Sequence, residues 1–538
     1  MDDSELRWSE ARRRRQKRLR LVVWVFLGAI GVGVGGAVWW GSGSDKPDVG
    51  LLEGTVYARP EGVPAVQLSV ATAEWGIDEV DLDGADPMSG GIAPVDLDND
   101  GDLDLVVANG SVKVLLWDGG RYGPQIDLGV ADAVSVAAGD LDSDGWTDLL
   151  IARTGGSDLV VWGGEWLTGS GARAEPLGLA GGAPSAILLP ADLDGDGRLE
   201  IVRLGRGGRS GTPDVIWSQT VDDPRSFTSV TLPGSDRLSL AAAIADVDGD
   251  GLLDIWVTRD VGWDLGGDSV YSRRGDRLGR WVDVADTLRA GLAIDGMGVT
   301  LADFDSDSDI DAYLSDIGDN EVLLSGEGGF VPSDNTGAAR IRPPGTPSSV
   351  VSSSWASGAA DLNLDGRLDL VVVGGGFPDG GVRNKIAGTS VALEEPPAIL
   401  VGIDGRHFVD DWPLLGLDLS LVGRSMALGD FDGDGDTDIV IVSQDGALTA
   451  LKNDSDRRSV TVEIPTSCGD GVEVEIATEG RVYRSVVPAQ TYGGSHARQV
   501  VVGLGDEPTT IRVDRPGDDL LVLRADQGSD RSVRVVAC

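Results

Sequence analysis

The chain has 538 residues, of which 88 are acidic and 44 are Lys or Arg, so its formal net charge is −44. So strong a negative charge argues against nucleic acid as a partner, and against an anionic membrane surface as a partner of the acidic part of the chain. Only two Cys and two His occur, and no Ser/His/Asp or Cys/His catalytic set can be assembled from them.

The N-terminal segment predicts a basic tail and a membrane span. Residues 1–20 end in ARRRRQKRLR, and residues 21–40 carry no charge and end in Trp39 and Trp40. A helix of that length covers about 30 Å, the thickness of a bilayer core. The alternative is a cleaved signal peptide, whose apolar part usually has about 7 to 15 residues. We expect an uncleaved transmembrane helix at 21–40 in the lipid bilayer, with 1–20 cytoplasmic by the positive-inside rule. Everything after a linker at 41–64 is then periplasmic or at the cell surface.

Residues 66–70 are the first predicted strand. They belong to VQLSVATAEWGI (66–77), which is similar to WVDVADTLRAGL (281–292) and FVDDWPLLGL (408–417). Each of the two later segments precedes an acidic repeat, whereas the first has no repeat before it. We therefore expect 66–70 to form the outer strand of the last repeat's sheet, because that pairing would close a ring of sheets and leave no open edge.

From residue 96 onward, the acidic phrase Asp-x-Asp/Asn-x-Asp-Gly/Ser-x-x-Asp/Glu occurs seven times between apolar runs. Side chains at alternate positions of an extended segment point the same way, so those at positions 1, 3 and 5 can converge on one cation. Glycine at position 6 lets the chain turn, so the carbonyl of position 7 and the carboxylate of position 9 can complete the all-oxygen shell that Ca²⁺ prefers. The predicted ligands are Asp96, Asp98, Asp100, Asp102 and Asp104; Asp140, Asp142, Asp144, Trp146 and Asp148; Asp192, Asp194, Asp196, Arg198 and Glu200; Asp246, Asp248, Asp250, Leu252 and Asp254; Asp303, Asp305, Asp307, Asp309 and Asp311; Asp361, Asn363, Asp365, Arg367 and Asp369; and Asp430, Asp432, Asp434, Asp436 and Asp438.

Two alternatives compete with these calcium sites. An EF-hand needs an acid at position 12 and a helix on each side, but position 12 holds Val107, Ile151, Arg203, Val257, Leu314, Val372 and Ile441. The flanking runs, such as LDLVVA and TDIVIV, are short and rich in β-branched residues, which predicts strands. A solvated acidic turn without metal explains any single copy. Repetition of the same acids at the same offsets favours up to seven Ca²⁺ ions.

The spacing of the repeats predicts one ring-shaped domain. Their first aspartates lie 44, 52, 54, 57, 58 and 69 residues apart, close to the length of one propeller blade. We predict an all-β fold, with a seven-bladed β-propeller at 65–458 and one calcium-binding hairpin loop in each blade. Tryptophans in strand contexts, such as Trp117, Trp162, Trp217 and Trp256, are expected to pack between the blades.

The last segment, 459–538, is predicted to be a separate small β domain. It contains both cysteines, Cys468 and Cys538. In an exported protein two such thiols can form a disulfide; two unpaired thiols are the alternative.

The acidic repeats resemble the FG-GAP, or VCBS, repeats of the integrin alpha-subunit propeller. GMGVTLADFDSDSDIDAYLSDIGDNEVLL (296–324) and GRSMALGDFDGDGDTDIVIV (423–442) resemble still more closely the cartilage acidic protein family. That resemblance implies a C-terminal ASPIC/UnbV-type domain, similar to GVEVEIATEGRVYRSVVPAQTYGG and VVVGLGDEPTTIRV, with a β-sandwich-like fold. The family's usual Trp-Pro before a Gly is replaced by Asp514-Arg515-Pro516-Gly517. The family's calcium ligands fall on the positions given above. Ser308 and Asn363 depart from the pattern, so the fifth and sixth sites should bind calcium most weakly.

Two classes of function agree with these features. The first is a non-enzymatic, membrane-anchored recognition or cell-adhesion module, with a protein or glycan ligand on one propeller face. The alternative is a surface enzyme that acts on polysaccharide, because glycosidase chemistry needs only two carboxylates. Most clustered acids already have a predicted metal role, and His407 and His496 lie far apart in the sequence. We therefore expect the first class and no catalytic site.

Overall fold

The structure of the chain is a computed structural model. It describes residues 59–538 except for 85, 165–172, 178–183, 207–211, 221, 276–277, 334–335, 340, 342–349, 378–389, 405, 479–480, 489, 505–508, 515–520, 526–531 and 537–538. The predicted tail 1–20, the predicted membrane span 21–40, most of the linker and Cys538 lie outside the described residues. Within the described part of the chain, no helix is long and apolar enough to cross a membrane. The chain divides into two units, Met1–Thr55 and Val56–Cys538, and all described residues belong to the second.

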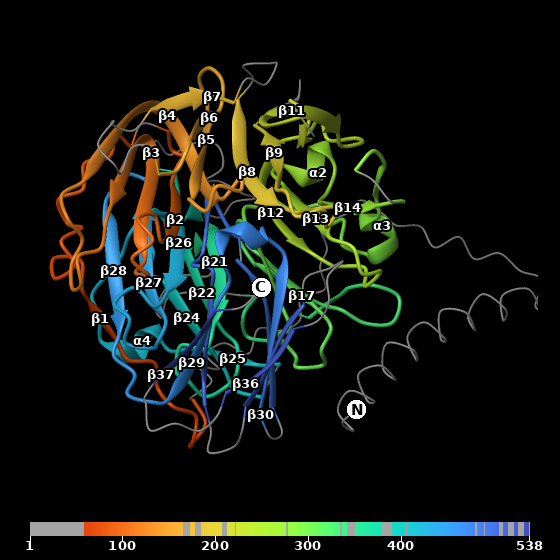
Figure 1. Ribbon diagram of the computed structural model, residues 1–538. Coiled ribbons are helices and arrows are strands. Elements are labelled where there is room, and N and C mark those ends of the chain that lie inside the picture. Colours follow the sequence, from red (N-terminus) through yellow and green to blue (C-terminus); the bar gives the residue numbers. More distant parts are fainter. Residues whose placement is uncertain are drawn as a thin grey trace, which may run out of the picture. The chain divides into compact units, whose positions relative to one another are not determined.

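Four-stranded antiparallel sheets make up most of this second unit (Figure 1). One of these sheets consists of β8 (Ser185–Ala191), β9 (Glu200–Gly205), β10 (Val215–Thr220) and β11 (Asp223–Thr231). The next consists of β12 (Ser239–Ala245), β13 (Asp254–Arg259), β14 (Ser269–Arg273) and β15 (Trp281–Asp283). Another consists of β21 (Ser354–Ala360), β22 (Asp369–Gly374), β24 (Ala398–Gly402) and β25 (Phe408–Asp410). A fourth arrangement of four strands is half of an eight-stranded sheet and consists of β16 (Val299–Ala302), β17 (Asp311–Leu314), β18 (Glu321–Leu324) and β19 (Val331–Pro332). The runs predicted as strands on both sides of the acidic phrases are therefore strands, which excludes the EF-hand alternative.

The first two acidic repeats share one six-stranded sheet, because two of its strands are unusually long. Its members are β2 (Gly91–Val95), β3 (Asp104–Leu115), β4 (Ile126–Gly139), β5 (Asp148–Arg153), β6 (Leu159–Val161) and β7 (Ala174–Pro176). The first half of β3 pairs with β2 and its second half with the first half of β4, after a register shift at Gly110. The second half of β4 pairs with β5. The sheet thus consists of two four-stranded arrangements joined end to end.

The last acidic repeat completes its sheet with a strand from the start of the described chain. β26 (Gly423–Gly429), β27 (Asp438–Ser443) and β28 (Leu448–Asn453) are followed by β1 (Leu68–Val70), which pairs antiparallel with β28. Leu68 lies opposite Asn453 and Val70 opposite Leu451. The prediction that 66–70 supplies this outer strand is confirmed.

The innermost strands of the sheets form a closed cycle. In order of contact they are β2, β4, β8, β12, β16, β21 and β26, and β26 returns to β2. An all-β chain whose antiparallel sheets are arranged in a cycle has the architecture of a β-propeller, in which closure leaves few open strand edges. Short helical turns occupy connections: α2 (Gly262–Leu265), α3 (Ala285–Leu288), α4 (Trp412–Leu415) and the 3₁₀ turn η3 (Thr466–Cys468).

Neighbouring sheets bury both faces of the strands between them. In β9, Ile201 packs with Leu150 and Ala152 of the preceding sheet. The alternate residues Val202 and Leu204 pack with Ile255 and Val257 of the following sheet. Because side chains alternate across a strand, a strand buried on both sides is a continuous apolar run. Trp117, Trp162, Trp217 and Trp256 are all buried, which confirms their predicted role in packing.

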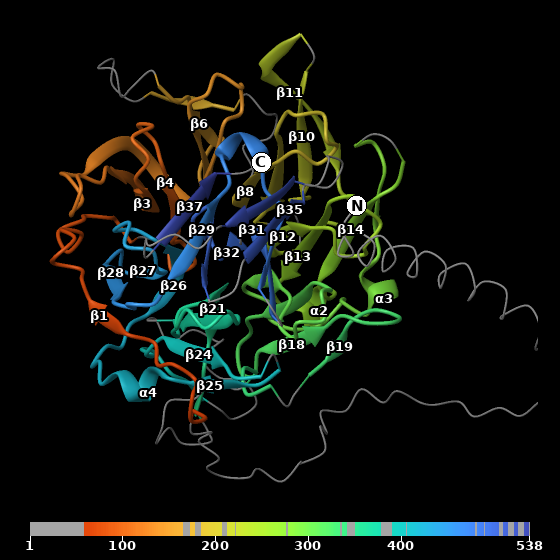
Figure 2. The ribbon, with the colours of Figure 1, turned by 60° about the horizontal axis from the view of Figure 1, so that its bottom comes forward.

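The C-terminal residues form two further sheets and one short hairpin (Figure 2). One sheet has the order β34 (Gln499–Gly503), β29 (Ser459–Glu463), β37 (Ser532–Val536). The other has the order β31 (Arg481–Val487), β30 (Val472–Thr478), β35 (Thr509–Asp514), β36 (Leu521–Ala525), and joins β16 at Ala302 and Ser485. The hairpin consists of β32 (Gln490–Thr491) and β33 (Gly494–Ser495). A two-residue parallel pair, β20 (Val350–Val351) and β23 (Ser390–Val391), completes the strands.

Candidate metal centres in the acidic loops

Each acidic phrase is the turn between the first two strands of a four-stranded arrangement. We name these turns loop 1 (96–104), loop 2 (140–148), loop 3 (192–200), loop 4 (246–254), loop 5 (303–311), loop 6 (361–369) and loop 7 (430–438). In all seven, φ is 74 to 96° at position 6 and 51 to 76° at position 4. The expected turn at position 6 is confirmed, and Ser308 adopts it at a cost of about 1 kcal/mol relative to glycine. Position 4 has a weaker sequence signal, because Asn, Ser, Gly and even Leu364 occupy it.

Two carboxylates hold the backbone of every loop. The position 1 carboxylate accepts the amide of position 6 at 2.8 to 3.1 Å in all seven loops. The position 9 carboxylate accepts the amide of position 2 at 2.8 to 3.0 Å, also in all seven. These contacts return position 9 to the side of positions 1 and 3, as the spacing predicts.

The carboxylates that meet most closely are those of positions 1, 3 and 9. One oxygen from each lies within 4.8 Å of the others in loops 1, 2, 3 and 5, whereas in loop 4 positions 1, 3 and 5 meet in this way. In six loops, loop 4 among them, the position 5 carboxylate accepts the amide of position 7, at 2.9 to 3.1 Å. Positions 1 and 3 thus form the centre of the cluster, and positions 5 and 7 lie along its turn.

Burial makes these acids difficult to keep ionised. It raises the pKa of Asp104 and of Asp148 to about 7, and neighbouring carboxylates raise both further. The same two causes raise the pKa of Asp311 to about 8 and that of Glu200 to about 9. Carboxylates whose oxygens lie within 4.8 Å of one another repel each other unless a positive charge lies between them. The electrostatics of the loops therefore favour a bound cation.

Several loop oxygens are buried and have no hydrogen-bond partner among the described residues. At position 3 these are the Oδ1 atoms of Asp98, Asp142, Asp194, Asp305 and Asp432. Loop 4 has two more, Asp246 Oδ1 and Asp254 Oδ1, and loop 7 has Asp430 Oδ1. A buried acceptor without a donor costs about 1 to 3 kcal/mol, more when it is charged. All are hard carboxylate oxygens beside further carboxylates, so the residues present fit Ca²⁺.

Basic side chains pair with carboxylates of six loops, which was not predicted from the sequence. In loops 3 and 6 the base lies within the loop itself: Arg198 pairs with Asp196 at 2.5 Å and Arg367 with Asp365 at 2.9 Å. In four other loops the base comes from elsewhere in the chain. Arg225 pairs with Asp142 at 2.6 Å and Arg406 with Asp305 at 3.0 Å. Lys452 pairs with Asp432, and Arg274 lies 3.6 Å from Asp248 and 3.3 Å from Asp250. Arg274 and Lys452 come from later parts of the same sheet, whereas Arg225 and Arg406 come from the following sheet, so no local sequence pattern marks these four. Asp98 of loop 1 and Asp194 of loop 3 have no ion pair within 4 Å among the described residues, and each has a buried oxygen without a hydrogen-bond partner there.

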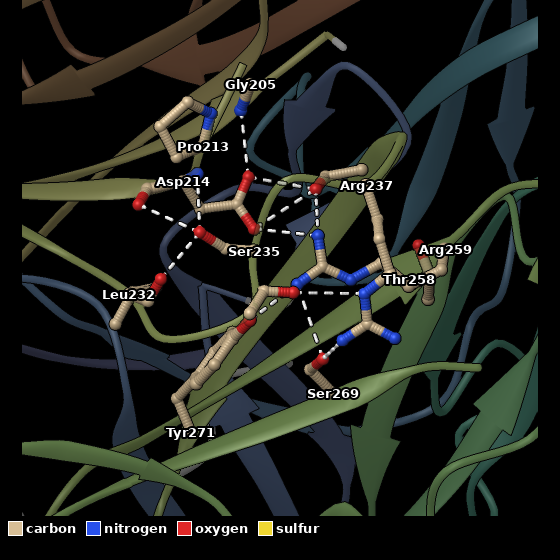
Figure 3. A network of polar contacts seen from close by, with 12 residues as sticks. Gly205, Pro213, Asp214, Leu232, Ser235, Arg237, Thr258, Arg259, Ser269 and Tyr271 are labelled. Carbon is tan, nitrogen blue, oxygen red and sulfur yellow. Dashed lines mark hydrogen bonds and ion pairs between the residues drawn. The ribbon is translucent and has the colours of Figure 1, made fainter. Parts of the chain in front are cut away.

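A second set of buried charges lies at the opposite ends of the sheets. Figure 3 shows one of these networks, around Asp214 and Arg259. Arg259, at the end of β13, pairs at 2.7 Å with Asp214, just before β10, and neither side chain is accessible. Ser239 Oγ donates to the same carboxylate, and Arg259 also donates to Tyr271 Oη at 2.7 Å. Arg203, Asp158 and Ser185 repeat the construction one sheet earlier, with the Arg203 Nε to Ser185 Oγ bond at 2.7 Å. In each case an Arg and a Ser of one sheet hold an Asp of the preceding sheet.

The two histidines and the described cysteine have separate environments. His407 is exposed and its Nδ1 pairs with Asp404 at 2.8 Å. His496 is buried; its Nδ1 accepts the Leu428 amide and its Nε2 donates to the Ser357 carbonyl, both at 3.2 Å. Burial lowers the pKa of His496 to about 4. Both ring nitrogens therefore serve the backbone. Cys468 is disulfide-bonded. Its predicted partner Cys538 lies outside the described residues, so that pairing stays a prediction.

Comparisons with known proteins agree with the repeats. A model described as an FG-GAP-like repeat matches residues 96–151, 140–203 and 192–257, and an FG-GAP repeat model matches 422–453. No curated protein sequence matches the chain. The BP39L lectin from Burkholderia pseudomallei is similar in structure, with 15% identity, 68% of this chain and 96% of the lectin covered, and a TM-score of 0.45. BBS1N from its complex with ARL6DN is similar too, with 14% identity, 68% and 94% covered, and a TM-score of 0.39. Backbone overlaps at this level carry no information about ligands.

Proposed function

We propose that the chain is a calcium-binding, non-enzymatic recognition or adhesion module, built on a seven-bladed propeller with one metal loop in each blade. The observation that carries this proposal is the buried position 3 oxygen without a hydrogen-bond donor, which recurs in five loops. In four of these loops, oxygens of the position 1, 3 and 9 carboxylates lie within 4.8 Å of one another. One buried oxygen without a hydrogen-bond donor has many explanations. The same oxygen at the same position of five turns indicates a ligand that all five loops share. The cycle of seven inner strands supports the number of blades.

Calcium would be held by positions 1, 3 and 9 of each loop, with positions 5 and 7 supplying further oxygens. When bound, it supplies positive charge that neutralises the clustered carboxylates and holds the turn in place. Extracellular calcium modules bind at roughly 10⁻⁴ to 10⁻³ M, which suits a structural ion. Seven divalent ions would supply 14 positive charges against the net charge of −44.

The cellular setting follows from the N-terminal sequence. We propose that residues 21–40 anchor the chain in the membrane and that the propeller lies outside the cytoplasm, where calcium is plentiful. The resemblance to the cartilage acidic protein family, with an ASPIC/UnbV-type C-terminal domain, is part of the same proposal. The two sheets and the hairpin that follow β28 are what an appended β domain requires.

The partner would be a protein or a glycan that contacts the ends of the sheets opposite the loops. Strands of the C-terminal sheets lie against the loops, for example through Arg534, which donates to the Gly101 carbonyl of loop 1 at 2.6 Å, and Gly503, whose amide donates to Asp361 of loop 6 at 2.8 Å. The loop ends are therefore occupied by the chain itself. Connections at the other ends are the surface left for recognition, as is common for loops carried on a rigid scaffold.

A binding array tests this proposal. The full-length chain, in calcium, would be applied to glycans and to extracellular proteins, in parallel with a screen for polysaccharide hydrolysis. We expect saturable binding to a defined ligand and no turnover. Turnover of a polysaccharide would instead support the enzymatic alternative, and its loss in a variant of two clustered acids outside the loops would identify the site.

A further inference from the structure

The C-terminal residues that follow β28 contact every one of the seven acidic loops. Three of these contacts end on the same atom, the carbonyl oxygen of position 6: Arg534 donates to Gly101, Arg484 to Ser308 and Ser459 to Gly435. Because position 6 is the residue where each loop turns, a donor on its carbonyl is sensitive to the conformation of that loop.

The remaining loops are contacted in other ways. In loop 6 the position 1 carboxylate of Asp361 accepts the Gly503 amide, and in loop 2 Thr147 Oγ1 lies 3.2 Å from Thr466 Oγ1. Beside loop 3, a Cβ at Gly469 would lie 2.8 Å from the Asp192 amide nitrogen. Beside loop 4, a Cβ at Gly471 would lie 2.7 Å from Leu253 Cδ2. Close packing thus replaces hydrogen bonds at these two loops.

The β32–β33 hairpin extends this association along the middle of the cycle of inner strands. It contacts β2, β4, β12, β16, β21 and β26. Near the loops, the Ala497 amide donates to the Leu428 carbonyl at 2.8 Å, just before loop 7. At the opposite ends of the strands, Tyr492 Oη donates to the Met88 carbonyl at 2.6 Å and its ring lies 5.0 Å from that of Trp355.

The hairpin packs tightly against the inner strands. A Cβ at Gly494 would collide with the Ile92 carbonyl, and a Cβ at Gly493 with the Gly90 carbonyl. On the side of the inner strands, a Cβ at Gly358 would collide with the His496 ring. Glycines on both partners are therefore required for the approach, which is a property of a permanent, shaped contact.

We propose that calcium binding to the loops is coupled to packing of the C-terminal domain (459–538) against the propeller. The domain is then a cap, and the stability of its contacts with the propeller depends on the bound ions. This inference rests on the proposed calcium sites. Without cations the loop carboxylates repel one another, and a loop that opens moves the position 6 carbonyl away from its donor in the cap. Loss of several such contacts loosens the domain and its hairpin together. By linkage, a cap that is weakly seated lowers the affinity of the loops for calcium by the same factor.

Hydrogen exchange of the full-length chain tests the first half of this coupling. Peptides covering 490–497 and β29 would be compared with peptides covering β11, an outer strand, in calcium and after chelation. We expect chelation to speed exchange in the hairpin and in β29 at least about tenfold, with a much smaller change in β11. Equal changes in all three, or none in the hairpin, would overturn the coupling.

Calcium titration of cap variants tests the second half. Gly494→Ala should unseat the hairpin and lower the mean calcium affinity by about fivefold or more. Its matched control is Gly326→Ala, because a Cβ at Gly326 meets nothing within 4 Å. Ser459→Ala removes only the bond to the Gly435 carbonyl, and its control in the same strand is Thr461→Val, whose hydroxyl has no hydrogen-bond partner among the described residues.

The outcomes separate this inference from the proposed function. If the wild-type chain binds no calcium, the metal sites themselves are wrong. If it binds calcium but Gly494→Ala and Gly326→Ala have equal affinity, the sites stand and the coupling is wrong. Should Gly494→Ala fail to fold, as circular dichroism would show, the Ser459→Ala and Thr461→Val pair decides: a weaker loop 7 in the first variant alone supports the coupling, and equal affinity contradicts it.

Discussion

The two ends of the propeller sheets hold buried acids in opposite ways. At one end, Asp214 is inaccessible but pairs with Arg259, and Asp158 pairs with Arg203 in the same construction. At the other end, Asp98 and Asp194 lie beside further carboxylates, and each has a buried oxygen without a donor among the described residues. The first end contains its own counterions. At the second end, bases pair with some of the loop carboxylates, as Arg225 does with Asp142. Asp98 and Asp194 have no such partner among the described residues, so the fold itself identifies where an external cation is needed.

Removal of calcium should have the largest effect, because it acts on all loops at once. Each site at tenfold excess over its dissociation constant would contribute about 1.4 kcal/mol, and seven sites on the order of 10 kcal/mol. We expect chelation to lower the melting temperature of the full-length chain by on the order of 10 °C. Restoration by calcium, but not by the same concentration of magnesium, is the control. An unchanged melting temperature would show that the acidic loops need no bound cation, and it would contradict the proposed difference between the two ends.

The opposite end should be sensitive to mutation but indifferent to calcium. Arg259→Met leaves Asp214 buried without its partner, and breaking a buried pair in this way typically costs about 3 to 5 kcal/mol. Denaturant unfolding should show the same loss with and without calcium. Lys113→Met is the control, because its partner Asp127 is largely exposed, and such pairs contribute less than about 1 kcal/mol. A calcium-dependent loss in Arg259→Met would show that the two ends are not independent.

His496, in the hairpin between the two ends, should make stability depend on pH. Its pKa is lowered to about 4 by burial, whereas in the unfolded chain it is about 6.5. The unfolded state therefore binds more protons between these values, so stability should fall as pH decreases from 6.5 to 4, by roughly 3 kcal/mol in total. The measurement is denaturant unfolding in saturating calcium at several pH values. His496→Gln should flatten this dependence; an identical pH profile in the variant would assign the loss to other groups.

The stabilisation that calcium gives should differ between loops, according to whether a basic side chain already pairs with the position 3 carboxylate. Asp98→Asn removes a carboxylate from a loop without an ion pair at position 3, so it should lower the calcium-dependent stabilisation by about 1 kcal/mol. Asp305→Asn should cost only a few tenths, because Arg406 already occupies that carboxylate and Ser308 strains the same loop. Melting with and without calcium would compare the two. Equal losses would show that the resident base does not weaken its loop.

Much of this architecture could be predicted from the sequence, where the signal was local and periodic. The strands on both sides of each loop, the positive φ at position 6 and the pairing of 66–70 with the last sheet follow from spacing and chain reversal. The bases beside loops 2, 4, 5 and 7 could not be predicted, because Arg225 and Arg406 reach their loops from distant positions in the chain. The same holds for the cap: nothing local marks Ser459 or Gly494 as contacts of the ring.

The count of bound ions tests the central claim most directly. Equilibrium dialysis of the full-length chain against millimolar calcium, followed by metal analysis, measures it without any assumption about partner or activity. The account predicts several ions per chain, up to seven, with loops 1 and 3 filling at the lowest concentration because their position 3 carboxylates have no ion pair among the described residues. Less than one ion per chain at saturation would contradict it.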